Sequence, residues 1–299
     1  MKPFFSIVIP TYNRAKLIKN TINNILNQTF QNFEIIIVDD GSTDNTSEVI
    51  QKEFDGNNKI KYFKKHNEER GKARNYGYVR AKGEYVVFFD SDDIMLPHNL
   101  EILYDGIKRE HPNFIASQYI IVDENGVKTG KGTSNKKSGR YTYKDFLKGN
   151  FLACHFGVKR ENVNIRLFEE DRKYSILEDW MFLISNLQKD ELLLESGIGV
   201  YILDHSNRSM SDNQLVIRRR LAANEKLNNS HKMSRKQNKI MNAYSYYFCA
   251  IHAYLDSERK QSLSFLYKAI LEVGIQFEFV ILFIKAILSY SIIKKIRSK

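Results

Sequence analysis

The chain has 299 residues, of which 42% are hydrophobic and 12% aromatic. This is enough for a sizeable core, in one large domain with an appendage or in two domains. Its two cysteines, Cys154 and Cys249, are far apart in apolar surroundings, which excludes a disulfide-stapled secreted scaffold and favours a reducing cytoplasmic compartment. The net charge of +11 is concentrated near the end, because residues 214–299 contain 16 basic and 5 acidic residues.

Strand-like apolar runs alternate with helix-periodic segments in the first third of the chain. The segment at residues 1–10 has too short an apolar stretch for a signal peptide and is expected to contain the first strand. Helices are expected around residues 18–26, through residues 49–50 and over residues 71–81. The strands that alternate with them are predicted at Phe4–Ile9, Phe33–Val38, Lys59–Phe63 and Tyr85–Phe89. This β-α-β order predicts a mostly parallel sheet flanked by helices.

The second part of the chain changes from mixed to purely helical patterns. We expect a helix at Asn99–Arg109, with Pro97 in its first turn, and a strand at Phe114–Val122. Gly126–Gly139 is expected to be a hairpin or a mobile loop. A helix at Glu178–Gln188 and a last strand at Gly199–Leu203 follow. Three further helices are expected over Leu215–Lys232, Lys236–Leu255 and Gln261–Ile296. We therefore predict an α/β domain of residues 1–211, followed by a basic helical region of residues 212–299.

Three carboxylates follow the expected strand Tyr85–Phe89, at Asp90, Asp92 and Asp93. Crowded carboxylates repel one another unless a cation lies among them, and hard oxygen ligands favour Mg²⁺ or Mn²⁺. The alternative is a solvated turn in which Asp92 or Asp93 caps the next helix.

Two other predicted strands end in polar residues at the same edge of the sheet, where open α/β sheets bind their ligands. Tyr12 can stack on a flat base, and Asp39 or Asp40 can accept a hydrogen bond from a ring N–H. Each segment alone is compatible with ordinary turn chemistry. Three such edges together predict a site of nucleotide size.

Five motifs occur in a fixed order: IVIPTYNR at residues 7–14, VDDGSTD at 38–44, GKARNYG at 71–77, DSDD at 90–93 and EDW at 178–180. Over about residues 3–211 the chain resembles the inverting glycosyltransferases of family 2, which have the GT-A fold. The resemblance implies a nucleotide-diphosphate sugar donor, with UDP as the expected nucleotide, a divalent cation, and transfer with inversion at the anomeric carbon.

The resemblance also implies a role for each matching residue. Asp179 is the expected general base, supported by Glu178, Arg208 and Trp180, which can shield the site or pack on a sugar ring. The metal ligands, for Mn²⁺ or Mg²⁺, would be Asp92, Asp93 and His205. The donor would be bound by Pro10, Tyr12, Arg14, Asp39, Asp40, Arg74, Asn75, Asp90 and Ser91.

Some of these residues also have a purely structural interpretation. Glu178 and Asp179 can serve only to cap their helix, and His205 can be an ordinary loop histidine. Lys64, Lys65 and His66 match nothing in the family pattern and are expected on the solvated surface.

The segment Ile275–Ile293 is almost wholly apolar, is interrupted by Glu278 and Lys285, and is followed by four basic residues before the end of the sequence. A transmembrane helix, a packed core helix and an interfacial helix are all compatible with it. Two central charges make spanning costly. The favoured interpretation is an interfacial helix that holds the protein peripherally on the anionic inner face of the cell membrane.

The predicted function is a metal-dependent transferase that builds cell-surface polysaccharide on a glycan or polyprenyl-linked acceptor. A nucleotidyltransferase also uses paired carboxylates, but it would bring a phosphate loop rich in glycine and lysine, which Pro10–Arg14 lacks. A nucleic-acid binder is disfavoured because no basic motif interleaved with aromatics occurs. A non-catalytic membrane scaffold would not be expected to keep all the carboxylates. The sequence sets no oligomeric state.

Overall fold

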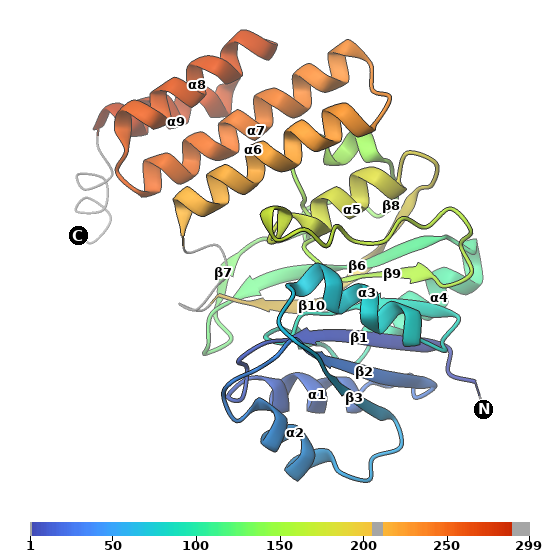
Figure 1. Ribbon diagram of the computed structural model, residues 1–299. Coiled ribbons are helices and arrows are strands. Elements are labelled where there is room, and N and C mark those ends of the chain that lie inside the picture. The colour runs from blue at the N-terminus through green and yellow to red at the C-terminus, as the bar shows by residue number, and fades with distance from the viewer. Residues whose placement is uncertain (1, 205–211, 289–299) are drawn as a thin grey trace. The chain divides into compact units, whose positions relative to one another are not determined.

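The computed structural model describes residues 2–204 and 212–288, which divide into two compact units (Figure 1). Of these residues, the first unit contains those within Met1–Tyr143, Phe151–Arg172 and Asn186–Ser206. The second contains those within Lys144–Asn150, Lys173–Ser185 and Asn207–Lys299. Two short segments from before residue 211 thus group with the C-terminal helices.

The first four strands of the first unit form a parallel sheet in the order β3-β2-β1-β4. They are β1 (Phe5–Thr11), β2 (Phe33–Asp39), β3 (Ile60–Lys64) and β4 (Tyr85–Phe88). Every residue of β1, β2 and β4 is buried, as the continuous apolar runs predict. The crossover helices are α1 (Ile18–Leu26), α2 (Thr46–Phe54) and α3 (Arg70–Arg80).

The rest of the sheet is mixed. Its strands are β5 (Ile94–Met95), β6 (Phe114–Val122), β7 (Lys128–Gly130), β8 (Gly139–Tyr141), β9 (Phe156–Lys159) and β10 (Leu192–Leu203). β9 lies between β4 and β6 and is antiparallel to both, whereas β10 is parallel to β6. β7 folds back on β6, so the hairpin interpretation of residues 126–139 is confirmed for its first strand.

Two local expectations differ from the structure. Pro97 precedes α4 (Asn99–Glu110), whose N-cap is His98, and so does not lie in the first turn. β10 begins seven residues before the predicted strand, because Glu195, Ser196 and Gly197 interrupt its apolar pattern. The pairing of β10 with β6 shifts register at this interruption, where the Glu195 carboxylate is paired with Arg109.

The core of the first unit joins the sheet to α1 and α4, with Ile7, Ile35 and Leu100 among its fully buried residues. α3 lies against the sheet at Gly77, the last glycine of GKARNYG. A Cβ at that position would come within 2.4 Å of a Val8 methyl group. Only glycine therefore allows this close approach of helix and strand.

The second unit is helical. It contains most of α5 (Glu178–Asn186), together with α6 (Asn213–Ser230), α7 (Arg235–Leu255), α8 (Arg259–Val273) and α9 (Phe277–Leu288). Two 3₁₀ turns, at Tyr143–Phe146 and Arg172–Tyr174, lie where the chain passes between the two units. A single helix over Gln261–Ile296 was wrong, because Gly274, with φ +78°, ends α8. Residues 289–296 lie outside the described residues.

The two cysteines are free and buried, as predicted, Cys154 in the first unit and Cys249 in the second. In the part of the chain that the structure describes, no helix has both the length and the apolar character needed to cross a membrane.

Candidate active site

The acidic turn after β4 meets a buried arginine. An Arg74 Nη2 of α3 lies 2.7 Å from Asp90 Oδ1, and the Arg74 side chain is only 1% exposed. The guanidinium also lies 5.4 Å from the centre of the Phe168 ring. Burial raises the pKa of Asp90, but Arg74, with His155 and Arg70, outweighs it and lowers this pKa below its ordinary value. Asp90 is therefore an anion at neutral pH.

The first and fourth motifs meet at Asp92. Arg14 Nη2 lies 3.2 Å from Asp92 Oδ2, and about a fifth of each side chain is exposed. The backbone N–H of Arg14 donates to Thr46 Oγ1, which fixes the loop after β1 to the start of α2. Tyr12 in the same loop is 45% exposed, so its ring is available for stacking.

Asp93 points into the first unit and not to its surface. Its Oδ2 lies 2.9 Å from Nε2 of the buried His155, and its Oδ1 accepts a hydrogen bond from the N–H of Leu203. The Asp93 carboxylate raises the pKa of His155, against the effect of burial. Asp93 thus holds the end of β10 beside the acidic turn. The backbone carbonyls of Ser91 and Asp93 accept from Thr21 Oγ1 of α1, which fixes the other side of the turn.

Sequence reasoning missed His155. It lies just before β9, a strand that the pattern did not predict, and no motif marks it. Ligand atoms of Asp90, Asp93 and His155 all lie within 4.8 Å of one another. Carboxylates with an imidazole suit Mn²⁺, and carboxylates alone suit Mg²⁺, so the residues present fit a divalent cation. Asp92 adds a partly exposed carboxylate, while His205 and Arg208 lie outside the described residues.

The carboxylates at the C-terminal end of β2 are engaged within the first unit. Asp39 Oδ1 accepts from the N–H of Ser42 at 2.7 Å, and Oδ2 accepts from the hydroxyl of Tyr62 at 2.6 Å. Asp40 forms an ion pair of 2.6 Å with Lys65, whose side chain is only 10% exposed. The expectation that Lys65 is solvated was therefore wrong, because Asp40 offers it a buried counter-ion.

Asn75 and Pro10 have structural partners. Asn75 Nδ2 donates to the carbonyl of Phe168, and its Oδ1 accepts from the N–H of the same residue, both at 2.9 Å. Pro10 is buried inside β1 opposite Val38. Asn75 thus holds the segment that carries the ring beside Arg74. The donor-binding roles of both residues stay predictions.

The EDW motif begins α5 and belongs to the second unit. Asp179 Oδ2 accepts from Asn150 Nδ2 at 2.8 Å, and Oδ1 accepts from the N–H of Trp180 at 2.6 Å. A carboxylate in the first turn of a helix is stabilised as an anion by the helix dipole. Glu178 is buried. The acidic turn belongs to the first unit, so the role of Asp179 toward a donor there stays a prediction.

Trp180 is packed inside the second unit. It is 1% exposed, its Nε1 donates to the carbonyl of Phe146, and Arg220 of α6 lies 3.5 Å from its ring centre. The ring therefore has little surface left for a sugar, and its predicted supporting role stays a prediction. Sequence reasoning did not predict this contact, because Arg220 lies 40 positions after Trp180 and outside the five motifs.

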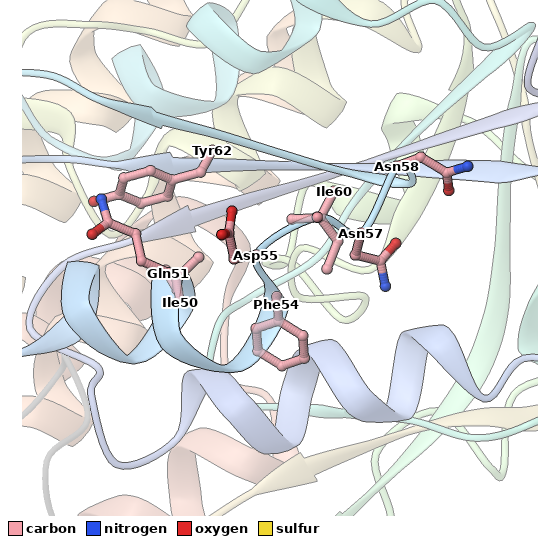
Figure 2. A pocket seen from close by; sticks show the side chains of 9 residues that line it. Ile50, Gln51, Phe54, Asp55, Asn57, Asn58, Ile60 and Tyr62 are labelled. Carbon is pink, nitrogen blue, oxygen red and sulfur yellow. The ribbon is translucent and has the colours of Figure 1, made fainter.

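A hollow of about 340 Å³ lies at the C-terminal end of α2 and the start of β3 (Figure 2). Ile50, Phe54, Asn57 and Tyr62 are among its lining residues. The predicted site residues that the structure describes are not part of this lining, so the hollow is separate from the acidic turn.

Comparison with known proteins identifies the family. Residues 6–168 match the family model described as glycosyl transferase family 2. The chain belongs to this family. A family 2 relative from Campylobacter jejuni, GalNAc(5)-diNAcBac-PP-undecaprenol beta-1,3-glucosyltransferase, is 33% identical over 172 residues, which is 56% of either chain. The chain spans only 20% to 56% of the length of this and several other curated relatives.

Solved structures confirm the GT-A fold that the resemblance implied. The structure of S. aureus TarS residues 1–349 in complex with UDP-GlcNAc has a TM-score of 0.68 at 21% identity and covers 90% of this family 2 chain and 81% of the TarS chain. The mannosyltransferase PcManGT from Pyrobaculum calidifontis, in complex with GDP-Man and Mn²⁺, has a TM-score of 0.58 at 16% identity. The match covers 96% of this chain and 81% of the PcManGT chain.

Proposed function

We propose that this protein is a metal-dependent, inverting glycosyltransferase that moves a sugar from a UDP-sugar to a hydroxyl group of a glycan or polyprenyl-linked acceptor. Its role would be cell-surface polysaccharide synthesis on the cytoplasmic side of the membrane. The observation that carries the proposal is the meeting of Arg14, Arg74 and the Asp90–Asp93 turn at the C-terminal edge of the parallel strands. The name of the Campylobacter relative, which specifies an undecaprenol-linked acceptor, supports the acceptor class. The ligands of the two solved neighbours support a nucleotide sugar and a divalent cation.

The proposal assigns a residue to each part of the reaction. Asp92 would hold a divalent cation, which supplies charge neutralisation for the departing diphosphate. Arg14 orients the Asp92 carboxylate, and Arg74 keeps Asp90 ionised toward the donor. Tyr12 offers its exposed ring to the base.

Asp179 would act as the general base. The acceptor oxygen forms a bond to the anomeric carbon while the bond from that carbon to the diphosphate oxygen breaks, and the hydroxyl proton passes to an Asp179 carboxylate oxygen. Inversion requires this base on the face opposite the leaving group. The hydrogen bonds from Asn150 and from the helix backbone hold the carboxylate in one orientation.

Two substitutions test the assignment. Asp179→Asn should lower the turnover number by about 10²–10⁴-fold, the usual contribution of a general base, while UDP binding measured by calorimetry stays unchanged. Asp92→Asn should weaken the Mn²⁺ dependence of both UDP binding and transfer. Asp105→Asn, on the exposed side of α4, is the matched control and should behave like the unaltered protein. Full turnover by Asp179→Asn and Asp92→Asn would refute the proposed roles.

A further inference from the structure

The last described helix, α9, is apolar on two opposite sides. Phe279, Leu282 and Ala286 are at most 5% exposed and belong to the core of the second unit. The other side, which we call the outer face of α9, is between 37% and 79% exposed and consists of Phe277, Val280, Ile281, Phe283, Ile284, Ile287 and Leu288. A helix that buries one apolar side normally presents a polar side to water. An exposed apolar surface of this kind marks an interaction site.

The two charged residues of α9 do not interrupt the outer face. Glu278 and Lys285 are seven positions apart and thus lie on one stripe of the helix. The Glu278 carboxylate accepts a hydrogen bond from the hydroxyl of Tyr244 of α7, which lowers the pKa of Glu278 and ties it to the second unit. The outer face is therefore a continuous apolar strip beside a narrow polar one.

The sequence that contains and follows this strip has an excess of positive charge. Residues 279–299 contain five basic residues and no acidic one, and residues 214–299 contain 16 basic and 5 acidic residues. Two copies of such a surface would repel each other, whereas an anionic surface would attract it. A protein partner of neutral charge would gain no electrostatic attraction from the excess of basic residues.

From these observations we infer that the outer face of α9 binds the surface of an anionic lipid bilayer. The apolar side chains enter the boundary between headgroups and acyl chains, and the basic side chains contact the lipid phosphates. Glu278 and Lys285 make it costly for this helix to span the bilayer, so we infer that it lies along the surface. This interaction is independent of the proposed sugar transfer and can be measured without any substrate.

Sedimentation of the full chain with vesicles tests the inference. The protein should bind vesicles of phosphatidylcholine with about one third phosphatidylglycerol, bind much less to phosphatidylcholine alone, and dissociate at about 0.5 M salt. Phe277→Ser with Ile284→Ser should reduce the partition coefficient by about tenfold or more for each side chain removed from the apolar layer. Lys294→Gln with Lys295→Gln should reduce it by about fivefold for each charge lost.

The control is Val163→Ser with Leu167→Ser, which removes two exposed apolar side chains from the first unit and should leave vesicle binding unchanged. Thermal unfolding would show that all variants are folded. Equal binding by the α9 variant and the control would overturn the inference. So would an oligomer of the lipid-free protein, detected by light scattering, that Phe277→Ser with Ile284→Ser dissociates, because a second copy would then cover the outer face.

Discussion

The pair of Asp40 and Lys65 shows how single residues of the donor site depend on partners distant in the sequence. Both side chains are at most 10% exposed, and the Asp40 carboxylate also accepts from the backbone N–H of Glu68. The pair therefore fixes the segment between β3 and α3 to the end of β2. The two buried charges neutralise each other, and Lys65 also lies 3.0 Å from the more exposed Glu68 carboxylate.

We expect Lys65→Met to lower the free energy of unfolding by about 3–5 kcal/mol, because it leaves the Asp40 carboxylate buried without its cation. Urea unfolding followed by circular dichroism would measure this. Lys64→Met changes the neighbouring, exposed lysine and should cost much less. Adding Asp40→Asn to Lys65→Met should recover part of the loss, and a double variant no more stable than Lys65→Met would contradict the pairing.

Residue identity predicted the acidic turn but not its buried neighbours. Asp90, Asp92 and Arg74 lie within recognisable motifs, and the structure brings them together with Arg14. His155 and Lys65 belong to no motif. Their roles depend on burial beside a carboxylate that is distant in the sequence, and burial is a property of the folded chain.

At the scale of elements, a polar network joins four strands at the edge of the sheet opposite the acidic turn. Glu34 of β2 accepts from Ser6 Oγ of β1 at 2.6 Å and forms an ion pair with Lys61 of β3. The N–H of Lys82 donates to Glu34, and that of Gly83, just before β4, donates to Ser6 Oγ. Burial raises the pKa of Glu34, but Lys61, Ser6 and Lys82 together lower it below its ordinary value.

Stability should therefore depend on pH through Glu34. Because its pKa is lower in the folded chain, the ionised carboxylate stabilises the fold above the unfolded pKa of about 4.3, and this contribution is lost as the pH falls through the lower folded value. Glu34→Gln should cost about 1–3 kcal/mol at pH 7 and progressively less below about pH 4. The measurement is urea unfolding at several pH values.

The control for this series is Glu84→Gln, which removes an exposed carboxylate near the same edge. Its unfolding free energy should differ little from that of the unaltered protein at every pH. A Glu34→Gln deficit that is the same at pH 7 and pH 3 would contradict the role of the ionised carboxylate.

The contact of α6 with α5 buries the guanidinium cation of Arg220, which is unfavourable for the stability of the fold. Arg220 lies on the ring of Trp180, and its Nε donates to Ser245 Oγ at 3.1 Å. One of its terminal nitrogens has no hydrogen-bond partner among the described residues. Burial lowers the pKa of Arg220 to about 9, against the attraction of Asp179, so the guanidinium stays charged at pH 7.

We expect Arg220→Met to leave the unfolding midpoint unchanged or raised while it lowers turnover. The pKa shift corresponds to about 5 kcal/mol against the charged form, whereas a cation–π contact contributes about 2 kcal/mol and a hydrogen bond about 1 kcal/mol. The loss of a cation near Asp179 should lower the turnover number by about tenfold or more. Thermal unfolding and transfer assays, with the exposed Arg218→Met as control, measure both effects; a lower midpoint with full turnover would contradict the prediction.

At the scale of the whole molecule, the predicted base is not part of the unit that contains the acidic turn. Residues 173–185 group with the C-terminal helices, and Trp180 contacts Phe146 and Arg220 inside that second unit. A boundary near residue 211 would therefore separate the proposed base from the helices with which it groups.

Ending the chain at residue 211 should expose Trp180, because the truncation removes Arg220 and α6–α9. Trp180 is the only tryptophan of the chain, so its fluorescence reports this change directly. We expect emission at longer wavelength and no transfer activity from the truncated chain, with parallel-sheet signals in circular dichroism retained. Blue emission together with normal turnover would show that residues 1–211 are self-sufficient.

Local sequence patterns were enough to predict the parallel β-α-β half of the sheet, the acidic turn at its edge and the family. Continuous apolar runs, glycine positions and short motifs are local features that can be recognised without knowledge of the fold. Only the folded structure shows that β9 enters the sheet antiparallel, that Lys65 pairs with a buried carboxylate and that His155 lies buried beside Asp93. The same holds for the contact of Arg220 with the Trp180 ring and for the solvent exposure of the outer face of α9. The physical reason is that burial and pairing join residues from distant elements, and a linear pattern does not record which of them meet.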